Sequence, residues 1–296
     1  MAEELMVEDL ALTTTQDPVP VAATGKRTDW WAEVKGLIWL VVAVLGFHSL
    51  VAKPFYIPSE SMMPGLLVGD RLVVTKFPYG YSFVTPTFHL MPFVSGRLFG
   101  SLPQRGDVVI VTPPGTRTDY IKRVIGLPGD RIQVQGGVVS INGRPVPRRA
   151  MGERLIAIDP NNQCSPGSYG MDATVKGADG RDYCRFAIYR ETLPNGRSYD
   201  TIDSSPYSEG DSYGPYTVAP NHVFLMGDNR DNSADSRFSL AQQGLGGAVP
   251  WENIGGRAEF ITFSLDGSAT LNPLTWARSF RSGRAGLSLH PQRAPQ

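Results

Sequence analysis

Residues 132–141 read Ile-Gln-Val-Gln-Gly-Gly-Val-Val-Ser-Ile, and this stretch indicates the fold class most clearly. Apolar and polar residues alternate up to Gly136-Gly137, and the apolar run resumes directly after the two glycines. Two glycines between such runs are typical of a tight two-residue turn, because glycine adopts the positive φ that this turn requires. The stretch therefore predicts an antiparallel β-hairpin.

Short apolar runs of the same kind lie on both sides of this hairpin. They predict strands over residues 71–77, 107–112, 223–226 and 257–263. The 32 glycines and 24 prolines exceed average usage, which favours a turn-rich, mainly β body over a helical bundle. The 296 residues could form one large domain or two small ones.

One long apolar segment stands apart from the β pattern. Residues 36–52 contain no charge and no proline, and they lie between Lys35 and Lys53 with aromatic residues beyond each end. This length is at the short end of what spans a bilayer, and the flanking lysines can reach the interface. We expect an uncleaved membrane anchor over residues 35–53. A buried core helix is the alternative, and a cleaved signal fits less well because the preceding segment is long and acidic.

The charges around the anchor suggest its orientation. Lys26, Arg27 and Lys35 precede the apolar segment, whereas Lys53 alone follows it closely. The positive-inside rule then places residues 1–34 in the cytoplasm as a polar tail, and the body on the other side of the membrane.

The body divides by composition. Residues 54–143 and 220–273 are predicted to form a β core, and residues 144–219, rich in Gly, Pro, Ser, Asp and Tyr, an inserted lobe. Residues 78–104 carry many aromatics, which either pack inward or dip into the membrane interface. The basic tail, residues 274–296, is expected to be frayed, with contact to anionic lipid as the alternative.

Cysteine usage and net charge limit the classes of ligand. Cys164 and Cys184 fit one disulfide in an oxidising compartment, although two unpaired thiols would look the same in the sequence. No Cys/His cluster has metal-ligand spacing, so we expect neither a metal site nor a cofactor. The formal net charge of zero gives no reason to expect nucleic acid as a partner.

Three polar motifs carry the chemistry. They are Ile57-Pro-Ser-Glu-Ser-Met-Met-Pro64, Asp119-Tyr-Ile-Lys-Arg123 and Gly227-Asp-Asn-Arg-Asp-Asn-Ser-Ala-Asp-Ser-Arg237. Pro58 and Pro64 restrict the backbone on both sides of Ser61. Lys122 lies in an apolar strand, where burial would disfavour its charged form and make it a general base near neutral pH. The alternatives are an ordinary turn serine and an edge-strand lysine that faces water.

Other candidate groups fit this chemistry less well. Gly210-Asp-Ser-Tyr-Gly214 matches the nucleophile-elbow pattern and is followed by His222, but no strand-turn-helix context surrounds it. Lys76 and Lys53 are possible rival bases, and both are expected to be solvated because each lies at the end of a strand or of the anchor.

The three motifs, in this order behind an apolar anchor, resemble bacterial type I signal peptidases. The resemblance covers roughly residues 55–76, 105–135 and 222–264 and implies a membrane-bound serine endopeptidase. It assigns the nucleophile to Ser61 and the general base to Lys122. It further implies an oxyanion-hole hydroxyl at Ser59, a lysine-orienting hydroxyl at Ser233, and an ionic scaffold of Arg123, Asp235 and Arg237.

The resemblance also implies a substrate and a location. The substrates would be signal peptides of preproteins exported by the Sec or Tat route, read at small residues by an apolar wall of Ile57, Pro58, Met62 and Ile121. The expected location is the inner membrane, with the body outside the cytoplasm and lipid as a neighbour. Residue 60 is Glu where the enteric form has Gly, and one span is found rather than two. A Ser-Lys self-cleaving regulator and a non-enzymatic β ectodomain remain as alternatives.

Overall fold

The computed structural model describes residues 29–86, 95–205 and 208–293. Its contacts divide the chain into two compact units, residues 1–41 and 42–296. Most of the predicted cytoplasmic tail, and part of the aromatic segment 78–104, fall outside the described residues.

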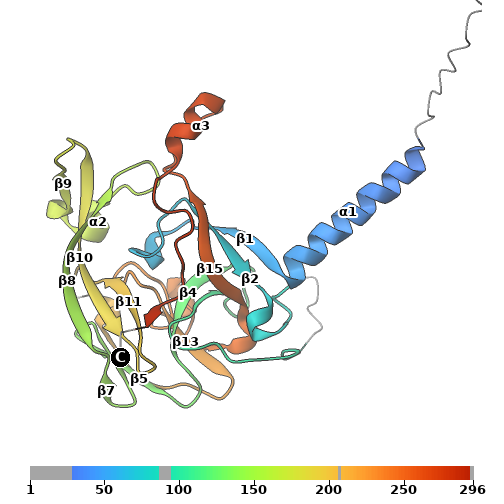
Figure 1. The fold of residues 1–296 in the computed structure, drawn as a ribbon. Helices are drawn as coiled ribbons and strands as arrows, with labels where there is room; N and C mark the ends of the chain where they lie inside the picture. The colour runs from blue at the N-terminus through green and yellow to red at the C-terminus, as the bar shows by residue number, and fades with distance from the viewer. Residues whose placement is uncertain (1–28, 87–94, 206–207, 294–296) are drawn as a thin grey trace, which may run out of the picture. The chain divides into compact units, whose positions relative to one another are not determined.

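One long apolar helix, α1 (Trp30–Leu50), lies near the N-terminus (Figure 1). The carboxylate of Asp29 accepts a hydrogen bond from the backbone N–H of Trp31, which caps the first turn. None of the helix residues is buried, and α1 is long and apolar enough to cross a membrane. The helix thus begins before the predicted start at residue 35, and Lys53 falls in the following strand rather than in the helix.

The body is mainly β, as predicted, and its largest sheet has seven antiparallel strands. Their order is β1-β2-β15-β3-β4-β13-β14, with bounds Ala52–Tyr56, Asp70–Thr75, Ile254–Ser264, Val108–Val111, Tyr120–Gly126, His222–Met226 and Val249–Pro250. All four residues of β3 are buried, and they contribute alternately to two core clusters. The middle of this sheet is therefore covered on both faces.

The predicted hairpin is confirmed and lies in a four-stranded sheet, β12-β5-β6-β7. Its bounds are Ser212–Thr217, Arg131–Gln135, Val138–Ile141 and Arg144–Pro145. Gly136 and Gly137 both have positive φ, 54° and 75°, as the turn requires. Strand β12 belongs to the predicted insertion in sequence but pairs with β5 of the core hairpin.

A further sheet holds most of residues 144–219. It has the order β16-β11-β10-β8, with β9 beside β10, and bounds Gln292–Arg293, Arg197–Ile202, Asp182–Thr192, Arg148–Ala157 and Thr174–Lys176. Cys184 of β10 forms a disulfide with Cys164, and both lie in a buried apolar cluster. Short helices complete the body: α2 (Pro166–Tyr169), α3 (Pro273–Ser279), η1 (Glu60–Met62), η2 (Phe77–Tyr79), η4 (Met171–Ala173), η5 (Glu209–Asp211), η6 (Leu240–Gln242) and η7 (Trp251–Asn253).

The expectation of a frayed C-terminal tail is wrong for the residues that follow α3. The backbone N–H of Leu289 donates to Glu259 of β15, and β16 pairs with β11, so this segment connects two sheets (Figure 1). The Arg284 side chain donates to the fully buried Asp70 carboxylate at 2.8 Å. The sequence pattern missed this because each arginine has its partner far away in the chain: Arg281 pairs with Asp159 in the same way.

Replacing Arg284 with Met should lower the stability of the body, because it leaves the Asp70 carboxylate buried without its cation. We expect a loss of about 3 kcal/mol, or roughly 6–12 °C in Tm. Arg278→Met in the exposed α3 helix is the matched control and should shift the free energy of unfolding by no more than about 0.5 kcal/mol. Equal Tm values for the two variants would contradict the role given to the Arg284–Asp70 pair.

Candidate active site

Ser61 lies in the single turn η1, directly after the edge strand β1. Two backbone hydrogen bonds fix the start of this loop: Ile57 donates to Asp70, and Gly69 donates to Ile57. The Ser61 side chain is buried, at 7 % exposure. The loop therefore presents its hydroxyl from a defined and largely enclosed position.

Lys122 lies near the middle of β4, which is an interior strand between β3 and β13. Its Nζ donates to Ser61 Oγ at 2.9 Å and to the backbone oxygen of Ile121 at 3.0 Å. Burial lowers the pKa of Lys122 to about 8, opposed by the nearby carboxylates of Asp235 and Asp228. The Lys122 side chain is 4 % exposed and its strand has a neighbour on each side, so the alternative of an edge-strand lysine that faces water is wrong.

The loop Gly227–Arg237 approaches Ser61 from the side of β13. The backbone N–H of Asn229 donates to the backbone oxygen of Ser61 at 3.1 Å. The Asn229 side chain donates to the backbone oxygen of Glu60 at 3.2 Å. Gly227 allows this approach, because a Cβ there would lie 2.5 Å from the backbone oxygen of Ser61 and 2.2 Å from Ser233 Oγ. The loop and the serine turn are thus joined through backbone atoms.

The charged residues behind the site form separate ion pairs rather than one shared cluster. Arg237 pairs with Asp235 at 2.9 Å, and both side chains are buried. Arg123 pairs instead with Asp228, through two hydrogen bonds of 2.7 and 2.6 Å. The role of Asp228 was missed, although it lies inside a quoted motif, because the sequence does not say which carboxylate faces which guanidinium.

A third pair was also missed, because one partner lies in the predicted inserted lobe, outside the three motifs. Arg230 and Glu191 of β10 form a fully buried bidentate contact with two distances of 2.6 Å. Hydrogen-bonded pairs of this kind hold their geometry tightly, since breaking one leaves a charge without a partner. All three pairs brace the loop that contacts Ser61.

Two predicted hydroxyls lie close to the Ser61–Lys122 pair. Ser59 Oγ is 3.4 Å from Ser61 Oγ. Ser233 Oγ is buried and has no hydrogen-bond partner in the described part of the chain, so the predicted hydrogen bond to Lys122 is not formed here. Catalytic contacts are often loose before substrate binds, and the orienting role of Ser233 remains a prediction.

Glu60 joins the serine turn to the disulfide-bonded lobe, which the sequence did not reveal. The Tyr169 hydroxyl of α2 donates to Glu60 Oε2 at 2.7 Å and accepts hydrogen bonds from Asn229 and Asn232. Burial and the Glu60 carboxylate raise the pKa of Tyr169, so it stays a neutral donor. The Glu that departs from the enteric form therefore has a partner that this lobe provides.

A cavity of about 400 Å³ opens beside Ser61 and Lys122. Its wall includes three of the four predicted pocket residues, Ile57, Pro58 and Ile121, whereas Met62 packs in the core beneath. Further lining residues come from the end of β1, from β3, and from the start of β4 with the two residues before it: Phe55, Tyr56, Ile110, Thr118, Asp119 and Tyr120. The wall is mainly apolar and also includes Ser61 and Lys122.

Comparison with known proteins identifies the family. The family model described as signal peptidase, peptidase S26, matches residues 30–263. The chain belongs to this family. It is a serine endopeptidase.

Curated relatives agree with this assignment. The chain is 36 % identical over 240 residues to signal peptidase I of Rickettsia typhi (strain ATCC VR-144 / Wilmington), covering 78 % of this chain and 80 % of that protein. It is 35 % identical over 246 residues to signal peptidase I of Rickettsia akari (strain Hartford), covering 80 % of each. A crystal structure of a signal peptidase I from Enterococcus faecalis V583 covers 53 % of this chain and 97 % of its own chain, at 20 % identity and a TM-score of 0.27, too low to support a structural argument.

The alternative catalytic groups suggested by the sequence are Ser212 with His222, and Lys76. Ser212 is exposed in β12, and His222 in β13 contacts the backbone oxygen of Pro220, so the described residues form no serine-histidine pair here. The expectation that Lys76 is solvated is wrong. Burial and the charge of Lys53 lower the pKa of Lys76 to about 8, and its ammonium lies over the Phe55 ring.

The glycine before Asp228 gives a test of the backbone contact in this peptidase. Gly227→Ala should abolish most activity. The added Cβ would lie 2.5 Å from the backbone oxygen of Ser61 and 2.2 Å from Ser233 Oγ, so one of these residues would have to shift. Gly65→Ala is the matched control, since a Cβ there meets only ordinary contacts of 3.6 and 3.7 Å. The measurement is the rate of peptide cleavage together with Tm. Equal activity of the two variants would show that the loop does not position the serine.

Proposed function

We propose that this chain removes N-terminal signal peptides from exported preproteins through an acyl-enzyme formed on Ser61, with Lys122 as general base. The observation that carries the proposal is the 2.9 Å contact between Lys122 Nζ and Ser61 Oγ in a buried setting. A serine hydroxyl is a weak nucleophile at neutral pH and needs such a positioned base.

In acylation, neutral Lys122 takes the proton of Ser61 while Oγ forms a bond to the scissile carbonyl carbon. The carbonyl electron pair moves onto its oxygen, and the peptide C–N bond breaks as the tetrahedral intermediate collapses. The leaving amine receives the proton from the Lys122 ammonium. In deacylation a water molecule gives a proton to Lys122 and attacks the ester carbon. The C–Oγ bond then breaks, the Lys122 ammonium returns the proton to Ser61 Oγ, and the signal peptide leaves as a carboxylic acid.

The developing oxyanion requires donors close to the nucleophile. The backbone N–H of Ser61 and the hydroxyl of Ser59 are the proposed pair, since Ser59 Oγ lies 3.4 Å from Ser61 Oγ. Ser233 is proposed to orient Lys122 after proton transfer, because the ammonium then has a third N–H that can donate to Ser233 Oγ. Its buried hydroxyl has no partner in the described residues, which leaves it available for that contact.

The sheet offers an edge for the substrate backbone. Strand β13 pairs with β4 from Arg123 onward, and β1 is the edge strand of the sheet. The backbone around Tyr120 and Ile121 and the residues after β1 therefore face the cavity from two sides. We propose that the peptide adds to this edge as an extended strand, so that alternate side chains enter the apolar cavity and bulky ones are excluded.

The apolar helix α1 is proposed to anchor the enzyme in the inner membrane, with residues 1–34 in the cytoplasm and the body outside it. The basic residues before the helix support this orientation. Preproteins delivered by the Sec or Tat route would then meet the body on the side of the membrane where they emerge.

The direct test of the function is processing of a preprotein by the full chain in detergent. Ser61→Ala should lose cleavage completely and keep the wild-type Tm, because it removes one hydroxyl from a turn held by backbone contacts. Sequencing of the product should place the cut after a small residue. Cleavage above a few per cent of the wild-type rate would exclude Ser61 as the nucleophile, and self-cleavage alone would favour a regulator.

The pH dependence tests the base. A pKa of about 8 for Lys122 means that the active neutral form is lost below this pH, so kcat/KM should fall about tenfold per pH unit from pH 7 downward. Activity should reach its plateau above about pH 9. Lys122→Met should be inactive, whereas Lys76→Met, which removes the other buried lysine, should keep the same acidic limb. If the acidic limb moved in Lys76→Met, the titration would belong to Lys76, and Lys122 would not be the base that the pH profile reports.

A further inference from the structure

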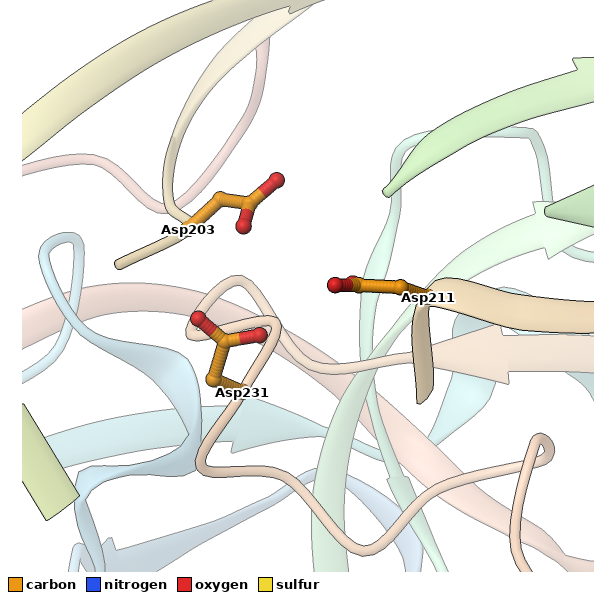
Figure 2. Close-up of side chains that lie close together, drawn as sticks. All are labelled: Asp203, Asp211 and Asp231. Atoms are coloured by element: carbon orange, nitrogen blue, oxygen red, sulfur yellow. The ribbon is translucent and has the colours of Figure 1, made fainter. Parts of the chain in front are cut away.

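Three aspartates from separate parts of the chain converge beside the active-site loop (Figure 2). Asp203 follows β11, Asp211 ends η5 just before β12, and Asp231 lies within the loop Gly227–Arg237. One carboxylate oxygen of each lies within 4.8 Å of the other two. Figure 2 shows the three carboxylates pointing into one shared space.

Protein contacts hold each carboxylate by one of its oxygens. Asp231 Oδ2 accepts hydrogen bonds from the backbone N–H groups of Ser204 and Ser205, at 2.7 and 2.8 Å. Asp211 Oδ2 accepts from the backbone N–H of Ser208 at 3.0 Å. Asp203 Oδ2 pairs with Arg148 at 2.6 Å. The orientation of the three groups is therefore set before any ligand arrives.

The second oxygen of Asp211 points independently to a ligand. The Asp211 side chain is 5 % exposed, and its Oδ1 is buried without a hydrogen-bond partner among the described residues. Oδ1 of Asp231 is likewise buried and has no hydrogen-bond partner among the described residues. Buried charged oxygens that lack a donor are costly and rare in native proteins, so these two need a counter-ion or a proton.

The surrounding charges do not neutralise the cluster. Within the described ranges, Arg148 is the one cation in ion-pair contact with it, while Arg237 donates to the backbone oxygen of Gly210 and pairs with Asp235. Burial, followed by repulsion from Asp231, raises the pKa of Asp211. Gly137 leaves the space open, because a Cβ there would lie 2.6 Å from Asp203 Oδ2.

We propose that Asp203, Asp211 and Asp231 bind one Ca²⁺ ion. An all-carboxylate set without His or Cys is atypical of a zinc site and suits a hard cation. With Ca–O distances of 2.3–2.6 Å, opposite ligands of Ca²⁺ are up to about 5 Å apart, which accommodates a cluster whose oxygens lie within 4.8 Å. Mg²⁺ fits less well, because it demands a tighter octahedral shell and usually takes one or two protein carboxylates.

The ion would add a link between two segments that already touch through the Ile202–Asn229 bridge and the hydrogen bonds to Asp231. It would tie the connection between β11 and β12 to the loop that carries Asn229 and Ser233 next to Ser61. Sequence spacing could not reveal this site, because its ligands lie 28 residues apart from first to last and follow no metal-binding pattern. The proposal concerns stability and does not depend on the proposed function.

The test uses the purified full chain in detergent after treatment with EDTA and removal of the chelator. Calorimetric titration with CaCl₂ should give one site per chain. Thermal unfolding should show a Tm higher by about 3–6 °C at a Ca²⁺ concentration ten times Kd. MgCl₂ at the same concentration should give a smaller rise.

Asp211→Asn and Asp231→Asn keep the oxygen that accepts the backbone hydrogen bonds and remove the charge. Both should weaken Ca²⁺ binding at least tenfold, and without Ca²⁺ Asp211→Asn should melt no lower than the wild type, because repulsion is relieved. Asp182→Asn, in an exposed ion pair with Lys176, is the matched control and should bind as the wild type does. No Ca²⁺ binding by the wild type at millimolar concentration, unchanged binding by both cluster variants, or an equal Tm rise with Mg²⁺ would overturn the proposal.

Discussion

The burial of Lys122 in an interior strand is the constraint on which the site depends. A lysine ammonium in this position lacks the water that would stabilise it, and its pKa falls to about 8. The surrounding sheet accounts for the burial, because β4 has strands on both sides and apolar clusters on both faces. The same sheet places Ser61 against the lysine, through the loop that follows the edge strand β1.

The loop Gly227–Arg237 converts this burial into a fixed geometry. Its backbone contacts Ser61, and its Asp228 and Asp235 carboxylates form separate buried ion pairs with Arg123 and Arg237. Burial lowers the pKa of Lys122, the charges of Asp235 and Asp228 oppose that shift, and the charge of Arg237 lowers the pKa further. The balance among these charges keeps the pKa of the lysine within reach of neutral pH. Glu60 and Tyr169 extend the bracing to the lobe with the disulfide.

Local sequence patterns predicted the parts of this structure that depend on neighbouring residues. The hairpin around Gly136-Gly137 follows from turn chemistry, and the strand that holds Lys122 follows from its apolar run. The pairings that the sequence did not predict join distant residues: Arg123 with Asp228, Arg284 with Asp70, and Tyr169 with Glu60. Lys76 was misjudged for the same reason. Its place at the end of a strand suggested water, but Phe55 and the neighbouring strands cover it.

The most direct measurement is the pKa of the Lys122 amine itself, by NMR titration of the full chain labelled with ¹³C at the lysine Cε. The spectrum of Lys122→Met identifies its resonance, and that of Lys76→Met separates the other buried lysine. The account predicts that the Lys122 resonance titrates at a pKa of about 8. Titration at the ordinary lysine value of about 10.4 would contradict it, because only about 0.04 % of the amine would then be neutral at pH 7, against about a tenth at a pKa of about 8.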